Sequence, residues 1–274
     1  MPMRLTADER AARRDIDTWA QSLSSPVSQL INWAMQPVDW VVERSVSGEM
    51  LDRAEDVTAE ALSQLSDMSA RTGVLDTVRS DARAQGIEID AVEDLRHEPL
   101  EVLDELARTR MQQNALIAAL EGGGTGLGGA ALLVADIPLL FTINFRVIQT
   151  ISACYGFPMH DAAYRPLVLA IFTAAASGSR ATRADALRES SVAAAALVHD
   201  HPYSGRRTGS FHEQNRHVPR EIAKALIRRK LGQLIPLAGA AVGAGVNYWF
   251  TKSTAKTSFM CSRALYLDWK ERHQ

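Results

Sequence analysis

The sequence Glu121–Pro158, EGGGTGLGGAALLVADIPLLFTINFRVIQTISACYGFP, joins a glycine cluster to a long apolar segment. The apolar segment has the pattern of a helix and contains only one acid, Asp136, and one base, Arg146. A helix that is apolar on nearly all sides lies either in a protein core or in lipid. The stretch therefore predicts a helical protein and makes membrane contact the first functional question.

The remaining sequence predicts further helices and no sheet. Thr6 and Glu9 have the spacing of a capping box, which opens an amphipathic helix. Apolar residues then recur at helical spacing, and the one piece with extended character is short, at residues 86–90. The helices expected after the first are residues 27–42, 50–71, 98–120, 130–153, 165–176, 181–198, 218–230 and 252–272, with an uncharged run at 231–250. We expect an all-α fold, a single helical domain of about nine or ten helices, with a glycine-rich turn between helices and apolar central helices.

The charges are unevenly distributed along the chain, although the net charge is only -2. Residues 1–113 contain 22 acids, 12 arginines and no lysine, whereas residues 114–274 contain 10 acids and 18 bases. We expect an N-terminal amphipathic helix at 1–24 and one domain at 25–274, with an acidic front half (25–113) and a basic half (114–274). Such a split fits either two complementary faces within the fold or a basic half that faces an anionic partner.

Composition excludes several classes of protein. Apolar residues make up 46% and charged residues 23% of the chain, which is typical of a folded globular protein and excludes disorder. Cys154 and Cys261 lie in apolar contexts and predict reduced core residues rather than a disulfide framework. The N-terminus lacks the apolar region of a signal peptide, so we expect a cytoplasmic protein.

The uncharged run at residues 231–250 has just enough length to cross a bilayer. Gly239 and Gly243 form a small-xxx-small pair that lets helices approach closely, and Tyr248 lies where an interfacial aromatic belt would be. Pro236 shortens the unbroken helix and argues against a full span. A span, an element that lies on the membrane and a soluble core helix all remain open.

Asp136 is the acid that the apolar segment has to accommodate. With Pro138 in the following turn, it can cap a second helical piece. It can also join Asn144 and Arg146 in a buried polar network that fixes the packing of the core. The third possibility is a functional acid in a membrane or a cavity.

Two patterns that suggest ligand chemistry fail the specific tests. The glycine cluster resembles a phosphate loop, but no Lys-Ser/Thr follows at the required spacing and the preceding element is a helix, so we expect a tight turn. His212 and His217 are one residue too far apart for a metalloprotease helix. We expect no metal, cofactor or catalytic residue. The alternative is a metal site on His199, His201 and His212.

A basic zone precedes the uncharged run. Its members are Arg206, Arg207, Arg220, Lys224, Arg228, Arg229 and Lys230. No nucleic-acid recognition motif accompanies them, so we expect no nucleic-acid partner. Their position beside an apolar run favours anionic lipid headgroups.

An ordered pair of motifs runs through the second half of the chain. Its residues are Glu121, Gly122, Gly124, Thr125, Gly126, Asp136, Pro138, Arg146, Tyr155, Gly156, Pro236, Gly239, Gly243, Asn247 and Tyr248. The pair resembles the EcsC protein family, which is named for a bacterial protein encoded beside an ABC transporter. The resemblance implies a bacterial helical protein connected with membrane transport or the cell envelope, and it supplies no catalytic residues.

These features together predict a cytoplasmic, membrane-associated accessory or scaffold protein. It would bind an anionic membrane surface or a membrane protein such as a transporter component. In this prediction residues 114–155 pack against the helix at 237–250, and Asp136 and Arg146 organise the polar interior. The alternatives are a soluble hydrolase, possibly metal-dependent through residues 199–217, and a soluble ligand-binding protein with a pocket beside Asp136.

Overall fold

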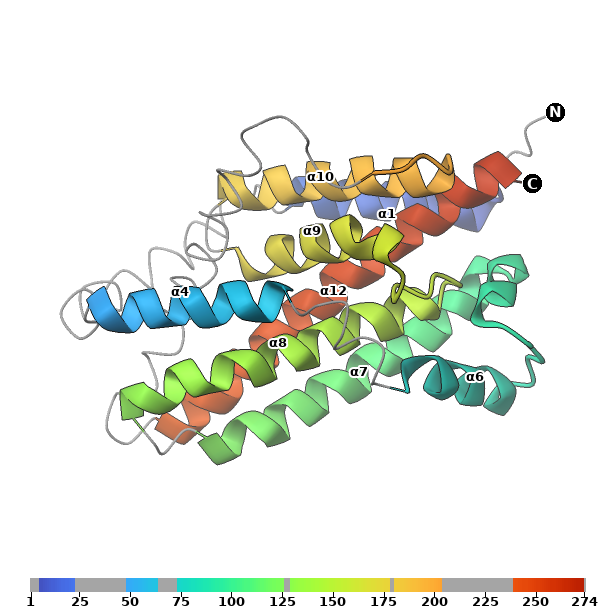
Figure 1. Cartoon of the computed structure of the whole chain (residues 1–274). Coiled ribbons are helices and arrows are strands. Elements are labelled where there is room, and N and C mark those ends of the chain that lie inside the picture. The colour runs from blue at the N-terminus through green and yellow to red at the C-terminus, as the bar shows by residue number, and fades with distance from the viewer. Residues whose placement is uncertain are drawn as a thin grey trace.

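The computed structural model describes residues 5–22, 48–63, 73–125, 129–177, 180–203 and 239–273. All regular structure in these ranges is helical, which confirms the all-α prediction. In chain order the α-helices are α1 (Ala7–Ser22), α4 (Gly48–Ser63), α6 (Val74–Ala84), α7 (Leu100–Thr125), α8 (Gly129–Ala153), α9 (Arg165–Ala176), α10 (Arg180–Val198) and α12 (Gly239–His273) (Figure 1). Short 3-10 helices lie at Val92–His97 (η1) and Ala162–Tyr164 (η2).

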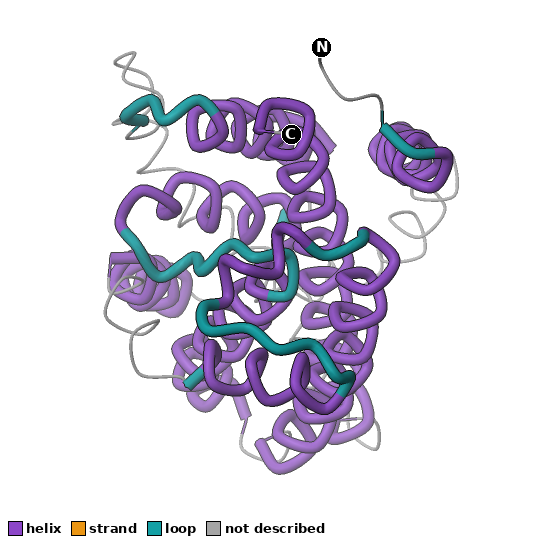
Figure 2. The backbone as a smooth tube through the Cα atoms, turned by 90° about the vertical axis from the view of Figure 1, so that its right-hand side faces the viewer, coloured by secondary structure: helices purple, strands orange, loops and turns teal. Residues whose placement is uncertain are grey.

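Helix α12 is the central helix of the fold. It spans 35 residues and packs against α1, α7, α8, α9 and α10 (Figure 1). Figure 2 shows the same helical body turned by 90°. Large buried side chains such as Phe259 and Tyr266 alternate along it with small buried hydroxyls such as Thr254 and Ser262. The small residues let neighbouring helices approach closely, and Ser262 shares a 2.8 Å hydrogen bond with Ser152 of α8.

Aromatic side chains from three helices meet in the middle of the core. Phe141 and Phe145 of α8 each lie 4.6 Å from Phe172 of α9, measured between ring centroids. Phe172 in turn lies 5.7 Å from Phe250 of α12. All four rings are buried, and burying each contributes about 1.5–3 kcal/mol, so this cluster joins α8, α9 and α12.

Two helix ends have the structures that the sequence predicts. The Thr6 N–H donates to Glu9 Oε2 at 2.7 Å, and the Glu9 N–H donates to Thr6 Oγ1 at 3.2 Å, which is a complete capping box. Helix α8 ends at Ala153 and is capped by Gly156, where φ is 82°. The N–H groups of Gly156 and Phe157 donate to the carbonyls of Ala153 and Ser152, which is the pattern of a Schellman cap.

Several predicted helix boundaries differ from the structure. Helix α8 runs unbroken through Asp136 and Pro138, so the predicted restart of the helix at Asp136 is wrong. Helix α7 continues through residues 121–125, so the turn before α8 is shorter than the whole glycine cluster. Residues 239–250 and 252–272, predicted as separate elements, form one helix. No strand forms at residues 86–90.

Other predicted elements lie outside the described residues. These are the helices at 27–42 and 218–230, most of the possible metal-site region at 199–217, from residue 204 onward, and the first part of the uncharged run, 231–238. The packing prediction is confirmed at the level of helices, because α12 contacts both α7 and α8.

Candidate functional site

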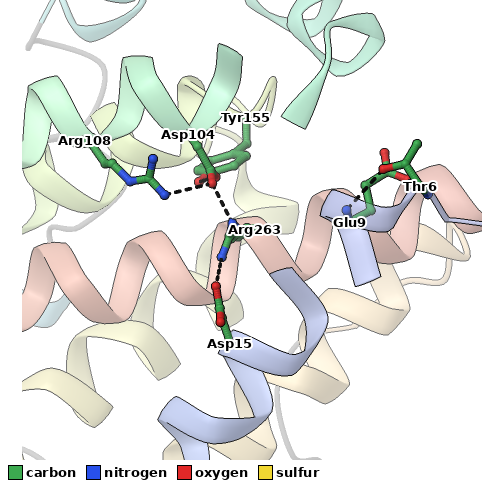
Figure 3. A network of polar contacts seen from close by, with 7 residues as sticks. All are labelled: Thr6, Glu9, Asp15, Asp104, Arg108, Tyr155 and Arg263. Atoms are coloured by element: carbon green, nitrogen blue, oxygen red, sulfur yellow. Dashed lines mark hydrogen bonds and ion pairs between the residues drawn. The ribbon is translucent and has the colours of Figure 1, made fainter. Parts of the chain in front are cut away.

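A buried carboxylate lies where α7, α12 and the end of α8 meet. Asp104 of α7 is only 3% exposed and accepts three hydrogen bonds. The donors are the Tyr155 hydroxyl at 2.7 Å, Arg263 Nη2 at 2.6 Å and Arg108 Nη2 at 3.2 Å (Figure 3). The Arg263 pair, with both side chains buried, makes this an ion pair in the interior that ties α7 to α12.

Ion pairs also hold α1 against α12. Arg263 Nη1 lies 3.4 Å from Asp15 Oδ2, which extends the network to α1 (Figure 3). In the first turn of α1, Glu9 accepts a 2.6 Å hydrogen bond from Lys270, and this pair is also largely buried. Arg13 of α1 pairs in the opposite sense, with Asp268 of α12 at 2.7 Å. Three acids of residues 1–113 therefore pair with bases of residues 114–274, as one of the two charge interpretations predicts.

The pKa directions agree with this geometry. Burial, followed by the negative charge of Asp104, raises the pKa of the Tyr155 phenol well above its usual range, so this hydroxyl stays protonated and acts as a donor. Burial acts to raise the pKa of Glu9, but hydrogen bonds from Lys270 and Thr6 outweigh it, and the pKa is lowered. Near neutral pH the Tyr155 hydroxyl therefore stays a donor and the Glu9 carboxylate stays an acceptor, as their contacts require.

The Tyr155-Gly156 pair joins α8 to η1. Arg96 Nε donates to the Gly156 carbonyl at 2.7 Å, and its guanidinium lies 4.8 Å from the centre of the Phe157 ring. A Cβ on Gly156 would lie 2.5 Å from Arg96 Cγ and 2.9 Å from the Arg96 backbone nitrogen. Both the positive φ and this close approach require glycine here.

Sequence reasoning identified Tyr155 and Gly156 but missed their partners. Asp104 occupies the same helical face as the buried Leu100, Leu103 and Ala107, and an acid on an apolar face is the signal that could have singled it out. The chain itself gave no sign that its partner would be Arg263, because 159 residues separate the two.

Arg146 does not organise the interior. Its side chain is exposed, and the buried polar residue of this part of α8 is Asn144, whose Nδ2 donates to the Leu140 carbonyl at 2.7 Å. Consecutive helical positions differ by about 100°, so residues two apart face nearly opposite directions. The backbones of Glu121 and Asp136 are helical, but their side chains lie outside the described part of the structure.

The structure describes two of the three histidines of the possible metal site. His199 and His201 follow α10 and are exposed, with their rings 6.2 Å apart, and Arg272 contacts His199. His212 lies outside the described residues. Within the described ranges no group of three potential metal ligands occurs.

The ends of three helices converge at one tip of the molecule. The C-terminal end of α7 and the N-terminal ends of α8 and α12 lie together at the lower left of Figure 1. Going inward from this tip, the first basic residue is Arg110 on α7, Arg146 on α8 and Lys252 on α12. The segments beyond these bases contain two acids, Glu121 and Asp136, and no other charged residue. We call the three segments beyond these bases the uncharged tip.

Apolar surface is exposed at the uncharged tip. Leu139 of α8 is 45% exposed and Tyr248 of α12 is 39% exposed. Lys252 Nζ lies 5.5 Å from the centre of the Tyr248 ring, so a cation and an aromatic ring mark the inner border of the tip on α12. None of the described helices has a stretch that is both long and apolar enough to cross a bilayer. Pro236 and the whole basic zone lie outside the described residues.

Comparison with known proteins gives a family match and two relatives. A model of the EcsC protein family matches residues 10–267. Protein EcsC of Bacillus subtilis (strain 168) is 32% identical over 155 residues, which is 57% of this chain and 60% of that protein. The uncharacterised protein YdbA of the same organism is 26% identical over 171 residues, which is 62% of this chain and 60% of that protein. The chain thus spans 60% of the length of these relatives, and no solved structure matches it.

Proposed function

The chain belongs to the EcsC protein family, and from this membership and the uncharged tip we propose that it is a cytoplasmic, membrane-associated accessory or scaffold protein. The tip enters one leaflet of an anionic membrane, and the rest of the helical body stays at the surface. There it is placed to contact a membrane protein, such as a transporter component. The observation that carries the proposal is the base that borders the tip on each of three helices.

The dimensions of the tip fit one leaflet. At 1.5 Å per residue, the segments beyond Arg110, Arg146 and Lys252 extend roughly 20–25 Å. A bilayer is about 40–45 Å thick including its headgroup regions, so one leaflet is roughly 20–22 Å deep and such a tip reaches about the midplane without crossing the membrane. This depth agrees with the finding that no described helix is suited to span a bilayer.

The border of the tip has the composition of a membrane interface. Arg146 and Lys252 are exposed, and long basic side chains at such positions place their charges among lipid headgroups while their stems cover apolar surface. Tyr248 lies one turn from Lys252, where interfacial aromatic residues are enriched. The basic zone at residues 206–230 adds cations that attract anionic lipid.

Two acids are the only charges within the tip. Glu121 lies near the end of α7, and Asp136 lies two turns into α8.

Vesicle co-sedimentation tests the proposal, using phosphatidylcholine vesicles with and without phosphatidylglycerol. We expect binding to the anionic vesicles, and a clear loss of binding in Leu139→Glu, which places a charge on the exposed face of the tip. Val192→Glu is the matched control, because Val192 is an equally exposed apolar residue (50%) on α10, away from the tip. Failure of the wild-type protein to bind either kind of vesicle would disprove membrane association.

Fractionation of cells at native expression separates the modes of attachment. Release from membranes by high salt means that headgroup contacts hold the protein, whereas resistance to salt and alkaline carbonate means that the tip is inserted. Alanine replacements at Arg228, Arg229 and Lys230 should weaken binding and lower its salt sensitivity if the basic zone faces lipid. A protein found only in the soluble fraction would contradict both modes.

A further inference from the structure

Three cationic side chains surround one buried aromatic ring. The charged ends of Arg108, Lys256 and Arg263 lie 5.6, 5.5 and 5.6 Å from the centre of the Phe259 ring. Arg108 comes from α7 and the other two from α12, where Lys256, Phe259 and Arg263 share one face through their spacing. The ring itself is buried, so packing fixes its position and the three cations lie around it.

The cluster carries more positive than negative charge. Asp104 is shared by Arg108 and Arg263, and Asp15 lies against Arg263 at 3.4 Å. Lys256 forms no ion pair with any carboxylate of the described residues. Three cations therefore face two carboxylates, and like charges this close repel one another.

Two further observations indicate that the positive charges and the hydrogen-bond donors of the cluster are not all compensated by its carboxylates. Burial, together with the charges of Arg263 and Arg108, lowers the pKa of Lys256. Arg263 is more than nine-tenths buried, yet its Nε has no hydrogen-bond partner among the described residues. A buried donor without an acceptor is costly, so the hydrogen-bonding capacity of this guanidinium is not fully used by Asp104 and Asp15.

We infer that Arg108, Lys256 and Arg263 form a binding site for the phosphate group of a ligand. A phosphate offers several acceptor oxygens to the guanidinium forks and a charge to the ammonium group. Lys256 is exposed and the Arg108 side chain is 58% exposed, so both can close on a ligand that arrives from solvent. Because the cations converge on one ring, the site suits a compact anion rather than an extended polymer.

The inference does not depend on the proposed membrane role. Free phosphate and the phosphate of a lipid headgroup present the same chemistry to these side chains. The cluster lies on α7 and α12 just inward of the uncharged tip, so either source has access to it.

Titration with inorganic phosphate, followed by calorimetry, tests the site in the full chain. We expect Lys256→Gln to bind phosphate about tenfold more weakly, because it loses one charge-assisted contact without disturbing the buried Asp104–Arg263 pair. Arg108→Gln should weaken binding to a similar extent, since Tyr155 and Arg263 still satisfy Asp104. Arg188→Gln, which removes an exposed arginine of α10, is the control and should bind as the wild type does.

Vesicles of phosphatidylcholine with and without phosphatidic acid identify the source of the phosphate. If Lys256→Gln also loses binding to the phosphatidic acid vesicles, the site takes a lipid headgroup. If only binding of inorganic phosphate falls, it takes a soluble phosphate, and this holds even when the wild type binds no vesicle and the membrane proposal fails. The inference is overturned if the wild type binds neither ligand, or if Lys256→Gln and Arg108→Gln bind both as well as the wild type does.

Discussion

Replacing Arg263 by methionine removes the charge that pairs with Asp104 while keeping most of the apolar volume of the side chain. Breaking a buried ion pair by removing one partner costs about 3–5 kcal/mol, because the remaining charge loses its counterion in the interior. Asp104 keeps its hydrogen bonds from Tyr155 and Arg108, so we place Arg263→Met at the lower end, about 3 kcal/mol. For a chain of this size, this corresponds to a melting temperature lower by roughly 6–12 °C.

A double-mutant cycle distinguishes this pair from a general packing effect. Asp104→Asn leaves Arg263 without its main counterion, and the double variant removes the pair altogether. We expect the double variant to lose at least about 1.5 kcal/mol less than the sum of the two single variants. Urea unfolding followed by circular dichroism measures all four proteins.

An exposed ion pair provides the control. Arg53→Met in α4 breaks the pair with Glu49, in which both side chains are more than two-thirds exposed, and should cost about 0.5 kcal/mol or less. A loss in Arg263→Met no larger than in this control, or strictly additive effects in the cycle, would refute the assignment of a coupled buried pair at the crossing of α7 and α12.

Three further predictions concern backbone, pH and thiol chemistry. Gly156→Ala should cost at least about 2 kcal/mol more than Gly86→Ala, because both have positive φ but only Gly156 has a backbone against its Cβ position; equal melting temperatures would contradict this. The folded-state pKa of Glu9 is depressed, so its contribution is present above the unfolded value of 4.5 and is lost as the pH falls through the lower folded pKa. Glu9→Gln should therefore flatten the acid limb of the stability curve below about pH 4.5, and an unchanged limb would count against the Lys270 contact. Burial raises the pKa of Cys154 to about 12, so a thiol reagent at pH 8 should react with it only on unfolding, and rapid labelling of the native protein would be the contrary result.

The sequence predicted those helices whose ends carry local signals. The expected helix at residues 165–176 coincides with α9, where a proline occupies the first turn. Gly156 was recognisable because a glycine directly after an apolar helix marks a left-handed cap. In such places the information lies within a few residues, so periodicity and capping chemistry are sufficient.

The predicted boundary within α12, between residues 250 and 252, was wrong. The composition changes from uncharged to charged near Lys252, which suggested a boundary between two elements. The helix continues through this point, because residues 250–273 contain no proline or glycine that would end it. The change in composition reflects different surroundings along one helix.

The prediction of a buried polar network that includes Arg146 was wrong for a different reason. In a helix that is apolar all round, spacing shows which residues share a face but not which face is buried, so the sequence assigned Arg146 to the interior as well as Asn144, and only Asn144 is buried. The pairing of Asp104 with Arg263 depends on how α7 and α12 cross, and that is set by the packing of the whole chain.

The central position of α12 has a consequence for biosynthesis. The helix against which α1, α7, α8, α9 and α10 pack is the last of the described elements to be translated. Glu9 and Lys270, which pair in the folded protein, are separated by 261 residues, so this contact has a very long loop to close. The fold should therefore be completed only once α12 has been synthesised, with the apolar faces of the earlier helices available to chaperones until α12 is inserted.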